Sequence, residues 1–124
     1  MPIVLVVDDN RPSRELVVDV LEQLEVEVAE APDGATALSS ARAIRPDLVI
    51  LDITMPDMDG FAVVRELRRD PLFANLPVLA LTANAMPEEP ARAMQAGFSD
   101  FLTKPVRSAE LRRRVEALLR GPRA

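Results

Sequence analysis

Short runs of apolar residues recur along the chain, and turn-forming or charged residues separate them. Most of these runs are rich in valine, isoleucine and leucine. Such runs are typical of strands that are buried on both faces of a sheet. The five predicted strands are Ile3–Val7, Val26–Ala29, Leu48–Leu51, Val78–Leu81 (ending at Thr82) and Phe98–Leu102.

Between these runs, apolar residues return every three or four positions, which predicts amphipathic helices. Asn10 can cap the first helix, with Pro12 tolerated in its first turn, and Ser108 can cap the last. Gly97 is the predicted end of the fourth helix. The five apolar stripes lie within Leu16–Leu24, Ala37–Ile44, Phe61–Leu67, Glu88–Gln95 and Leu111–Leu119.

Regular alternation of strands and helices predicts a parallel sheet, because each strand reaches the next through a right-handed helical crossover. Helices then cover both faces of the sheet. With 124 residues the chain is long enough for a single core, and residues 1–120 are predicted to form one domain. Residues 121–124 are expected to be a C-terminal tail or the start of a linker.

Polar residues follow the predicted strands at the points where they end. Asp8 and Asp9 follow the first strand, Asp52 the third, and Thr82 the fourth, while Lys104 comes shortly after the fifth. The carboxyl ends of parallel strands share one edge of the sheet, where open α/β sheets bind ligands. Three close carboxylates should raise one another's pKa, and a divalent cation and Lys104 would relieve that repulsion. Asp52 directly follows four core residues, which indicates a nucleophile or a ligand.

Composition narrows the chemistry further. The chain has no cysteine and no histidine, so thiolate and imidazole ligands are excluded and carboxylates remain as candidate metal ligands. A net charge of −5 argues against direct nucleic-acid binding. No apolar run approaches the length of a membrane span, and the N-terminus lacks the basic region of a signal peptide. We therefore expect a cytoplasmic location and no membrane partner.

Four motifs together resemble the receiver (phosphoacceptor) domain of two-component response regulators. They are VVDDN at 6–10, LDITMPDMDG at 51–60, ALTA at 80–83 and FLTKP at 101–105. The resemblance extends from Ile3 to about Leu119. It implies a flavodoxin-like (βα)5 three-layer sandwich, with a five-stranded parallel sheet of order 2-1-3-4-5.

The resemblance also implies a reaction at Asp52, which would accept a phosphoryl group from a phosphohistidine. Asp9, Asp52 and the backbone carbonyl of Thr54 would hold Mg²⁺ or Mn²⁺, and Asp8 would assist through water. The donor would be a histidine kinase or a histidine phosphotransfer protein. The chain would act as a signalling switch in a two-component or phosphorelay pathway, not as a multiple-turnover enzyme.

Further roles follow from the same resemblance. Lys104 would pair with the Asp52 carboxylate before transfer and with the phosphoryl group after it, and a cis peptide bond before Pro105 would help to aim Lys104. Thr82 would move toward the phosphoryl group and let Phe101 turn inward. The output would be a protein target on the face formed by helix four, strand five and helix five. Phe101 could equally be a plain core aromatic residue with no part in switching.

The sequence is also compatible with three different functions. The chain could be a receiver module of a hybrid histidine kinase or larger regulator, or a degenerate receiver that only binds proteins. It could also be an aspartyl-phosphate phosphatase of the haloacid-dehalogenase type, although Thr54 stands where those enzymes need a second aspartate. The resemblance to receiver domains also implies that Thr54 and Asn84 flank the attacking water and tune the phosphoryl lifetime.

Overall fold

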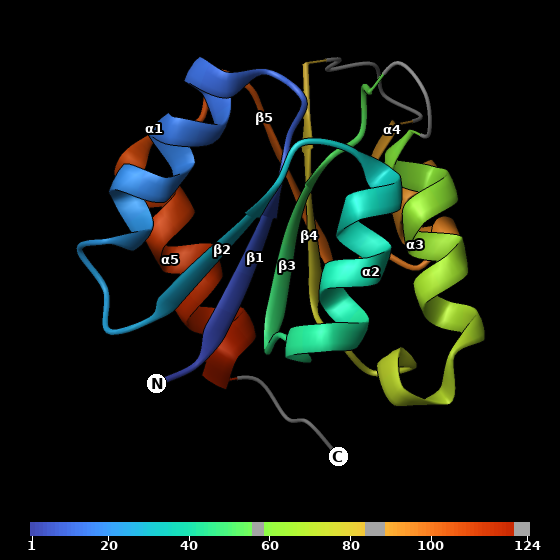
Figure 1. Cartoon of the computed structure of the whole chain (residues 1–124). Coiled ribbons are helices and arrows are strands. Elements are labelled where there is room, and N and C mark those ends of the chain that lie inside the picture. The colour runs from blue at the N-terminus through green and yellow to red at the C-terminus, as the bar shows by residue number, and fades with distance from the viewer. Residues whose placement is uncertain (56–58, 84–88, 121–124) are drawn as a thin grey trace.

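A computed structural model describes residues 1–55, 59–83 and 89–120, and strands alternate with helices through this part of the chain (Figure 1). Asn84 and the tail at residues 121–124 lie outside it. The strands are β1 (Ile3–Val7), β2 (Glu27–Ala31), β3 (Leu48–Asp52), β4 (Val78–Thr82) and β5 (Asp100–Thr103). The helices are α1 (Arg11–Leu21), α2 (Gly34–Ile44), α3 (Gly60–Arg69), α4 (Glu89–Ala96), α5 (Ser108–Arg120) and the 3₁₀ turn η1 (Pro71–Phe73).

All five strands are parallel and lie in the order β2-β1-β3-β4-β5, which confirms the predicted fold class. The order reverses at β1 and β3, whose carboxyl ends are therefore neighbours. In register, Val7 of β1 pairs with Leu51 of β3, and Asp52 pairs with Leu81 of β4. This register brings the carboxyl ends of the strands, with the polar residues located there, to one edge of the sheet, which lies at the top of Figure 1.

Each central strand contributes to two hydrophobic clusters, because successive side chains point to opposite faces of the sheet. Leu5 and Val7 pack with residues of α2 and α3 on one face. Val4 and Val6 pack with residues of α1 and α5 on the other. The fully apolar runs in β1, β3 and β4 are thus explained by helices on both sides (Figure 1).

Short polar side chains begin three of the helices. Asn10 accepts a hydrogen bond from the Ser13 N–H at 2.9 Å, which confirms its predicted role as the cap of α1. Asp33, predicted only as part of a turn, caps α2 by accepting from the Thr36 N–H at 2.7 Å. Asp59 caps α3 in the same way, through the Ala62 N–H at 2.9 Å.

Several predicted boundaries were wrong. β2 begins and ends later than Val26–Ala29, because its register against β1 runs from Glu27 to Ala31. Phe98 is buried, but it precedes β5 and packs edge-on against Phe61, with ring centroids 5.8 Å apart. Burial in the core, rather than a place in the strand, explains its apolar character. Ser108 is the first residue of α5 and not its cap, and the first helix ends at Leu21.

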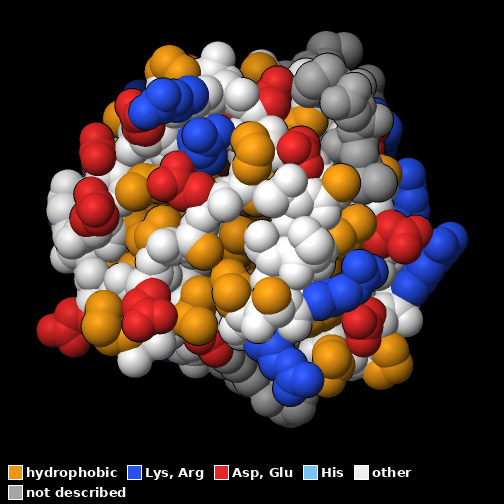
Figure 2. Space-filling view, viewed as in Figure 1, with side chains coloured by type: hydrophobic (Ala, Val, Ile, Leu, Met, Phe, Trp, Pro, Cys, Tyr) orange, Lys and Arg blue, Asp and Glu red, His pale blue; other side chains and the backbone are white. Residues whose placement is uncertain are grey.

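The surface mixes charges of both signs. Acidic and basic side chains are spread over the face shown in Figure 2, and hydrophobic side chains adjoin one another across its middle. Leu16, a predicted member of the apolar stripe of α1, is 52% exposed. Within the described ranges, none of the helices is both long and apolar enough to cross a membrane.

Arg68 ties the end of α4 to α3. Its guanidinium donates to the Gly97 carbonyl from Nε at 3.0 Å and from Nη2 at 2.7 Å, and to the Phe73 carbonyl from Nη1 at 2.7 Å. Gly97 has φ +115°, and a Cβ there would lie 3.0 Å from Arg68 Cγ, so the contact requires glycine. At the middle of α4, Arg92 lies 4.5 Å from the centre of the Phe61 ring.

We expect Arg68→Met to lower the free energy of unfolding by about 1–3 kcal/mol, because two half-buried carbonyls lose charged donors. The control is Arg69→Met. The Arg69 side chain is 76% exposed and pairs with Glu66 on the same helix. That change should cost less than about 0.5 kcal/mol. Urea unfolding followed by far-UV circular dichroism measures both, and equal losses would contradict the anchoring role.

Candidate functional site

Three carboxylates meet at the edge where β1 and β3 end. One oxygen from each of Asp8, Asp9 and Asp52 lies within 4.8 Å of the others. Asp8 is 1% exposed and Asp52 is 4% exposed, whereas Asp9 lies open to solvent. The sequence therefore predicted the right residues for this cluster, and the structure adds that only one of the three is accessible from outside.

Asp8 is held from three directions. Its backbone N–H donates to the Ala31 carbonyl of β2 at 3.2 Å, which continues the β1–β2 ladder. One carboxylate oxygen accepts from the Asn10 N–H at 2.9 Å, and the other accepts from Lys104 Nζ at 3.3 Å. The Asp8 carboxylate is thus locked in place by the loop that follows it and by a residue near the far end of the chain.

Asp52 is also held through both of its carboxylate oxygens. Oδ1 accepts from the Thr54 N–H at 3.1 Å, and Oδ2 lies 3.5 Å from Lys104 Nζ. The sequence did not predict the first contact, because it gave Thr54 a role through its carbonyl. Gly60 approaches the backbone of β3 closely, and a Cβ there would lie 2.9 Å from the Asp52 carbonyl and 2.7 Å from Ile53 Cα. Any larger residue at Gly60 would displace this segment.

Burial raises the pKa of Asp52 to about 6, because removal from water disfavours the charged form. The ammonium of Lys104 opposes the shift, and the neighbouring charge of Asp8 adds to it. The sequence predicted a raised pKa from repulsion among the carboxylates. The structure agrees on the direction for Asp52, but desolvation is the larger cause.

Lys104 connects the cluster to β4 and β5. It is the single lysine in a chain that otherwise uses arginine for its cations. A compact ammonium fits between two carboxylates, whereas a planar guanidinium needs a wider approach. The Lys104 backbone N–H donates to the carbonyl of Thr82 at 2.7 Å, and the peptide bond to Pro105 is cis. Thr82 is 1% exposed at the end of β4.

The donor set fits a hard divalent cation. Mg²⁺ binds oxygen ligands at about 2.0–2.1 Å, so opposite ligands stand about 4 Å apart. The carboxylate oxygens of Asp8, Asp9 and Asp52, all within 4.8 Å, can share one ion after a small adjustment or through bound water. Lys104 supplies one positive charge beside these carboxylates. A bound cation would offset the remaining negative charge. The residues present therefore suit Mg²⁺ or Mn²⁺.

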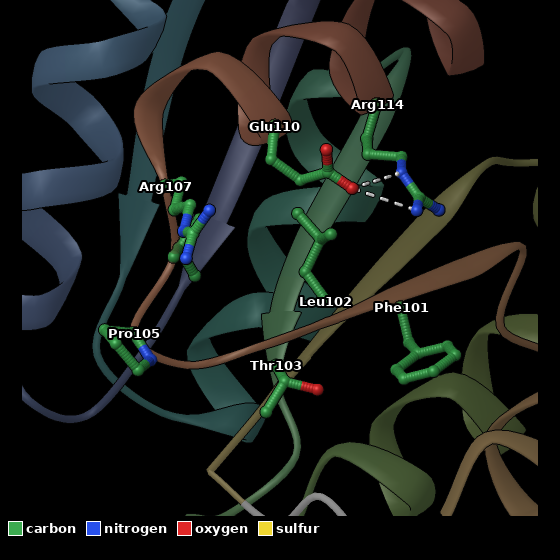
Figure 3. Close-up of a pocket in the computed structure, with 8 residues that line it drawn as sticks. Phe101, Leu102, Thr103, Pro105, Arg107, Glu110 and Arg114 are labelled. Carbon is green, nitrogen blue, oxygen red and sulfur yellow. Dashed lines mark hydrogen bonds and ion pairs between the residues drawn. The ribbon is translucent and has the colours of Figure 1, made fainter.

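A groove of about 300 Å³ lies between β5 and α5, away from the carboxylates. Figure 3 shows Phe101 and Thr103 on β5 along one side, with Glu110 and Arg114 of α5 opposite. Arg114 donates to both oxygens of Asp100, at 2.8 and 2.7 Å, and pairs with Glu110. Phe101 is partly buried and also packs against the α2–α3 side of the core. Its position is compatible with both roles considered for it.

The chain is similar in sequence to receiver domains of known signalling proteins. A family model described as the response regulator receiver domain matches residues 4–116. The chain is 40% identical over 120 residues to the DNA-binding dual master transcriptional regulator RpaA of Synechocystis, covering 97% of this chain and 50% of RpaA. It is 41% identical over 118 residues to hybrid signal transduction histidine kinase D of Dictyostelium discoideum, covering 95% of this chain and 8% of the kinase.

The chain is also similar in structure to a solved receiver domain. The receiver domain of sensor histidine kinase PA1611 from Pseudomonas aeruginosa superimposes with a TM-score of 0.89 at 32% identity, covering 97% of this chain and 98% of that one. That structure holds a magnesium ion in its active-site cleft. The chain therefore matches a whole receiver domain, and it spans half or less of RpaA and of the Dictyostelium kinase.

The raised pKa of Asp52 gives a prediction for the metal-free protein. The pKa of Asp52 is higher in the folded state than in the unfolded state. Its protonated form therefore favours the fold at low pH, and this contribution to the free energy of unfolding is lost as the pH rises through about 6. Asp52→Asn should therefore raise the free energy of unfolding near neutral pH by about 1–2 kcal/mol. The gain should fall as pH is lowered and vanish near pH 4.

Urea titrations at several pH values, with divalent metal removed, measure this effect. Asp19→Asn is the control, because it makes the same chemical change at an exposed position of α1. A gain for Asp52→Asn that does not depend on pH, or one that Asp19→Asn also shows, would contradict the assignment of the raised pKa to Asp52.

Proposed function

Because this chain belongs to the response regulator receiver domain family, we propose that Asp52 is its phosphoacceptor, taking a phosphoryl group from a phosphohistidine of a partner protein. The observation that carries the proposal is the placement of Asp52. It is a buried carboxylate at the end of a central strand, within reach of two further carboxylates and of Lys104. Phosphoryl transfer depends on such positioning and on neutralisation of charge.

The proposed transfer is a displacement at phosphorus. The carboxylate of Asp52 forms a bond to phosphorus while the bond from phosphorus to the donor histidine nitrogen breaks, and the electron pair returns to the imidazole ring. Lys104 lies 3.5 Å from Asp52 Oδ2, so its ammonium is placed to follow the charge from the carboxylate to the phosphoryl oxygens. The hydroxyl of Thr82, at the end of the neighbouring strand, is assigned to another phosphoryl oxygen.

Asp8, Asp9 and Asp52 are the proposed ligands of Mg²⁺ or Mn²⁺, with the Thr54 carbonyl as a fourth. Asp8 is assigned an indirect role through water, which agrees with its existing contact to Lys104. The ion, when bound, neutralises the oxygens of the transferring phosphoryl group. The solvent-exposed Asp9 leaves the site open on one side, as attack on a group carried by another protein requires.

The proposed output is a change at β5 and α5. The backbone hydrogen bond from Lys104 to Thr82 joins the last residue of β4 to the segment that follows β5. A movement of Thr82 toward a phosphoryl group would therefore shift the backbone of β5, and with it Phe101 and the groove that Phe101 lines. A phosphoryl group can shift this equilibrium only by interacting differently with the two states. The downstream protein is assigned to the face of α4, β5 and α5.

Further assignments concern the unit, its location and the activities it lacks. Residues 1–120 form the receiver unit, whether the chain acts alone or within a larger regulator or hybrid kinase, and its location is the cytoplasm. It does not turn over a substrate repeatedly, and it binds neither nucleic acid nor membrane directly. A haloacid-dehalogenase type of phosphatase is disfavoured, since the family match and the structural match are both to receiver domains.

Incubation with acetyl phosphate or phosphoramidate and Mg²⁺, followed by intact-mass measurement, tests the acceptor. We expect the wild type to gain the mass of one phosphoryl group and Asp52→Asn to gain none. Asp19→Asn should behave like the wild type. An unmodified wild type would refute the proposal, and repeated hydrolysis of a phosphomonoester would favour the phosphatase.

Lys104 is tested separately, because it is assigned to the response as well as to the transfer. Lys104→Ala should accept a phosphoryl group at least about tenfold more slowly, since one charge-assisted contact to the transferring group is lost. Once phosphorylated, it should leave the amide signals of β5 and α5 unchanged in a nuclear magnetic resonance spectrum. A normal spectral response of the phosphorylated variant would contradict the role of Lys104 in switching.

A further inference from the structure

Arg14 contacts the backbone of the carboxylate cluster at Asp8. It lies in the first turns of α1, and its Nη1 donates to the carbonyl oxygen of Asp8 at 2.8 Å. Its Nε donates to Glu30 Oε1 on β2 at 2.9 Å. The Arg14 side chain is only 15% exposed, whereas Glu30 is 45% exposed. The guanidinium therefore joins three elements: α1, the loop after β1, and the end of β2.

The carbonyl that Arg14 holds belongs to the peptide unit between Asp8 and Asp9. A peptide unit is planar and includes the Cα of the following residue. A hydrogen bond that holds the Asp8 carbonyl oxygen therefore restricts the orientation of this unit and the position of the Asp9 Cα. Asp8 has further restraints, because its carboxylate contacts Asn10 and Lys104. In the part of the chain that the structure describes, the Asp9 carboxylate has no recorded hydrogen bond or ion pair. The direction of Asp9 thus depends on its backbone.

Arginine suits this position better than lysine does. The guanidinium is planar and presents several donors in a fixed arrangement, so one group can bond to a carbonyl and a carboxylate at once. The contact to Glu30 holds the guanidinium in the orientation in which Nη1 donates to the Asp8 carbonyl. The Asp8 N–H also donates to Ala31, the residue after Glu30, at 3.2 Å. The loop after β1 is thus tied to the end of β2 by two separate contacts.

We propose that Arg14 is a positioning residue for the metal-binding carboxylates, which sets the Mg²⁺ affinity of the site by orienting the Asp8–Asp9 peptide without touching the ion. The inference rests on the proposed function, in which Asp8, Asp9 and Asp52 hold the metal. Residues that orient metal ligands from behind typically change metal affinity by about 10–100-fold when they are removed.

The positive charge of Arg14 has the opposite effect. A cation near the cluster repels Mg²⁺, so loss of charge alone would tighten metal binding. Two variants separate these effects. Arg14→Met removes the donors and the charge, whereas Arg14→Lys keeps the charge but cannot bond to both partners in the same geometry. Positioning predicts weaker binding in both variants, while charge alone predicts tighter binding in Arg14→Met and no change in Arg14→Lys.

Arg11→Met is the matched control. Arg11 lies on the same helix, and it also pairs with a glutamate, Glu15, at 2.9 Å, but its side chain is 80% exposed. The recorded contact of the Arg11 side chain stays within α1. Arg11→Met and Arg14→Met change the net charge equally, so a difference between them reports the contact to Asp8 rather than the overall field of the protein.

Isothermal titration of the full chain with Mg²⁺ gives the dissociation constant, and the phosphorylation rate with acetyl phosphate is measured beside it. The chain has no tryptophan or tyrosine, which makes calorimetry preferable to intrinsic fluorescence. We expect Arg14→Met to bind Mg²⁺ about tenfold more weakly. Arg14→Lys should bind it several-fold more weakly, and Arg11→Met should stay within about twofold of the wild type. Saturating Mg²⁺ should largely restore the phosphorylation rate of both Arg14 variants.

The outcomes separate the inference from the function beneath it. A wild type that binds Mg²⁺ and accepts phosphate, with both Arg14 variants equal to Arg11→Met, overturns the positioning role alone. Tighter binding by Arg14→Met also overturns it, in favour of charge repulsion. A wild type that binds no Mg²⁺ overturns the proposed metal site and the role of Arg14 with it. Should Arg14→Met not fold, Arg14→Lys carries the same test.

Discussion

The burial of a carboxylate beside two others is the constraint on which this edge of the sheet depends. Asp52 lies at the end of a strand with hydrophobic residues on both sides, and water reaches little of it. A charge in such a place is costly unless other groups compensate it. The compensation is shared: the Thr54 N–H donates to one oxygen, and the ammonium of Lys104 lies near the other. Lys104 serves Asp8 as well, so its position is determined by two carboxylates at once.

This compensation links distant parts of the fold. Lys104 follows β5, and its backbone donates to the end of β4, so the charge balance at β1 and β3 depends on the placement of the last two strands. β5 also forms one side of the groove that faces α5 (Figure 3). A change in charge at Asp52 therefore has a short physical path to the groove between β5 and α5. The path starts at the Lys104 ammonium beside Asp52 and continues through the backbone contact of Lys104 to Thr82, so the Lys104 side chain is its first link.

The helices contribute supports of different strength. α1 and α5 pack against one hydrophobic cluster, and α2 and α3 against the other. α4 is the shortest of the described α-helices, and Met94 on its surface is 54% exposed. The end of α4 is held by two hydrogen bonds from the guanidinium of Arg68 to the carbonyl of Gly97. Hydrogen bonds of this kind are directional, so they fix the end of the helix relative to α3.

The sequence by itself determined the alternation of strands and helices, the parallel sheet, and the residues that gather at the strand ends. These follow from local patterns, because buried strands require apolar runs and the carboxyl ends of parallel strands share an edge. The strand order was implied by the resemblance to receiver domains. The sequence also predicted the Asn10 cap, which depends on neighbours three residues away. Only the tertiary structure decided that Lys104 bridges Asp8 as well as Asp52, since Lys104 and Asp8 are 96 positions apart. It likewise decided that desolvation dominates the pKa of Asp52, and that Phe98 belongs to the core rather than to β5. The extent to which Asp52 is desolvated and the contact of Lys104 with Asp8 both arise between elements that are distant in the chain, so a local pattern does not specify them.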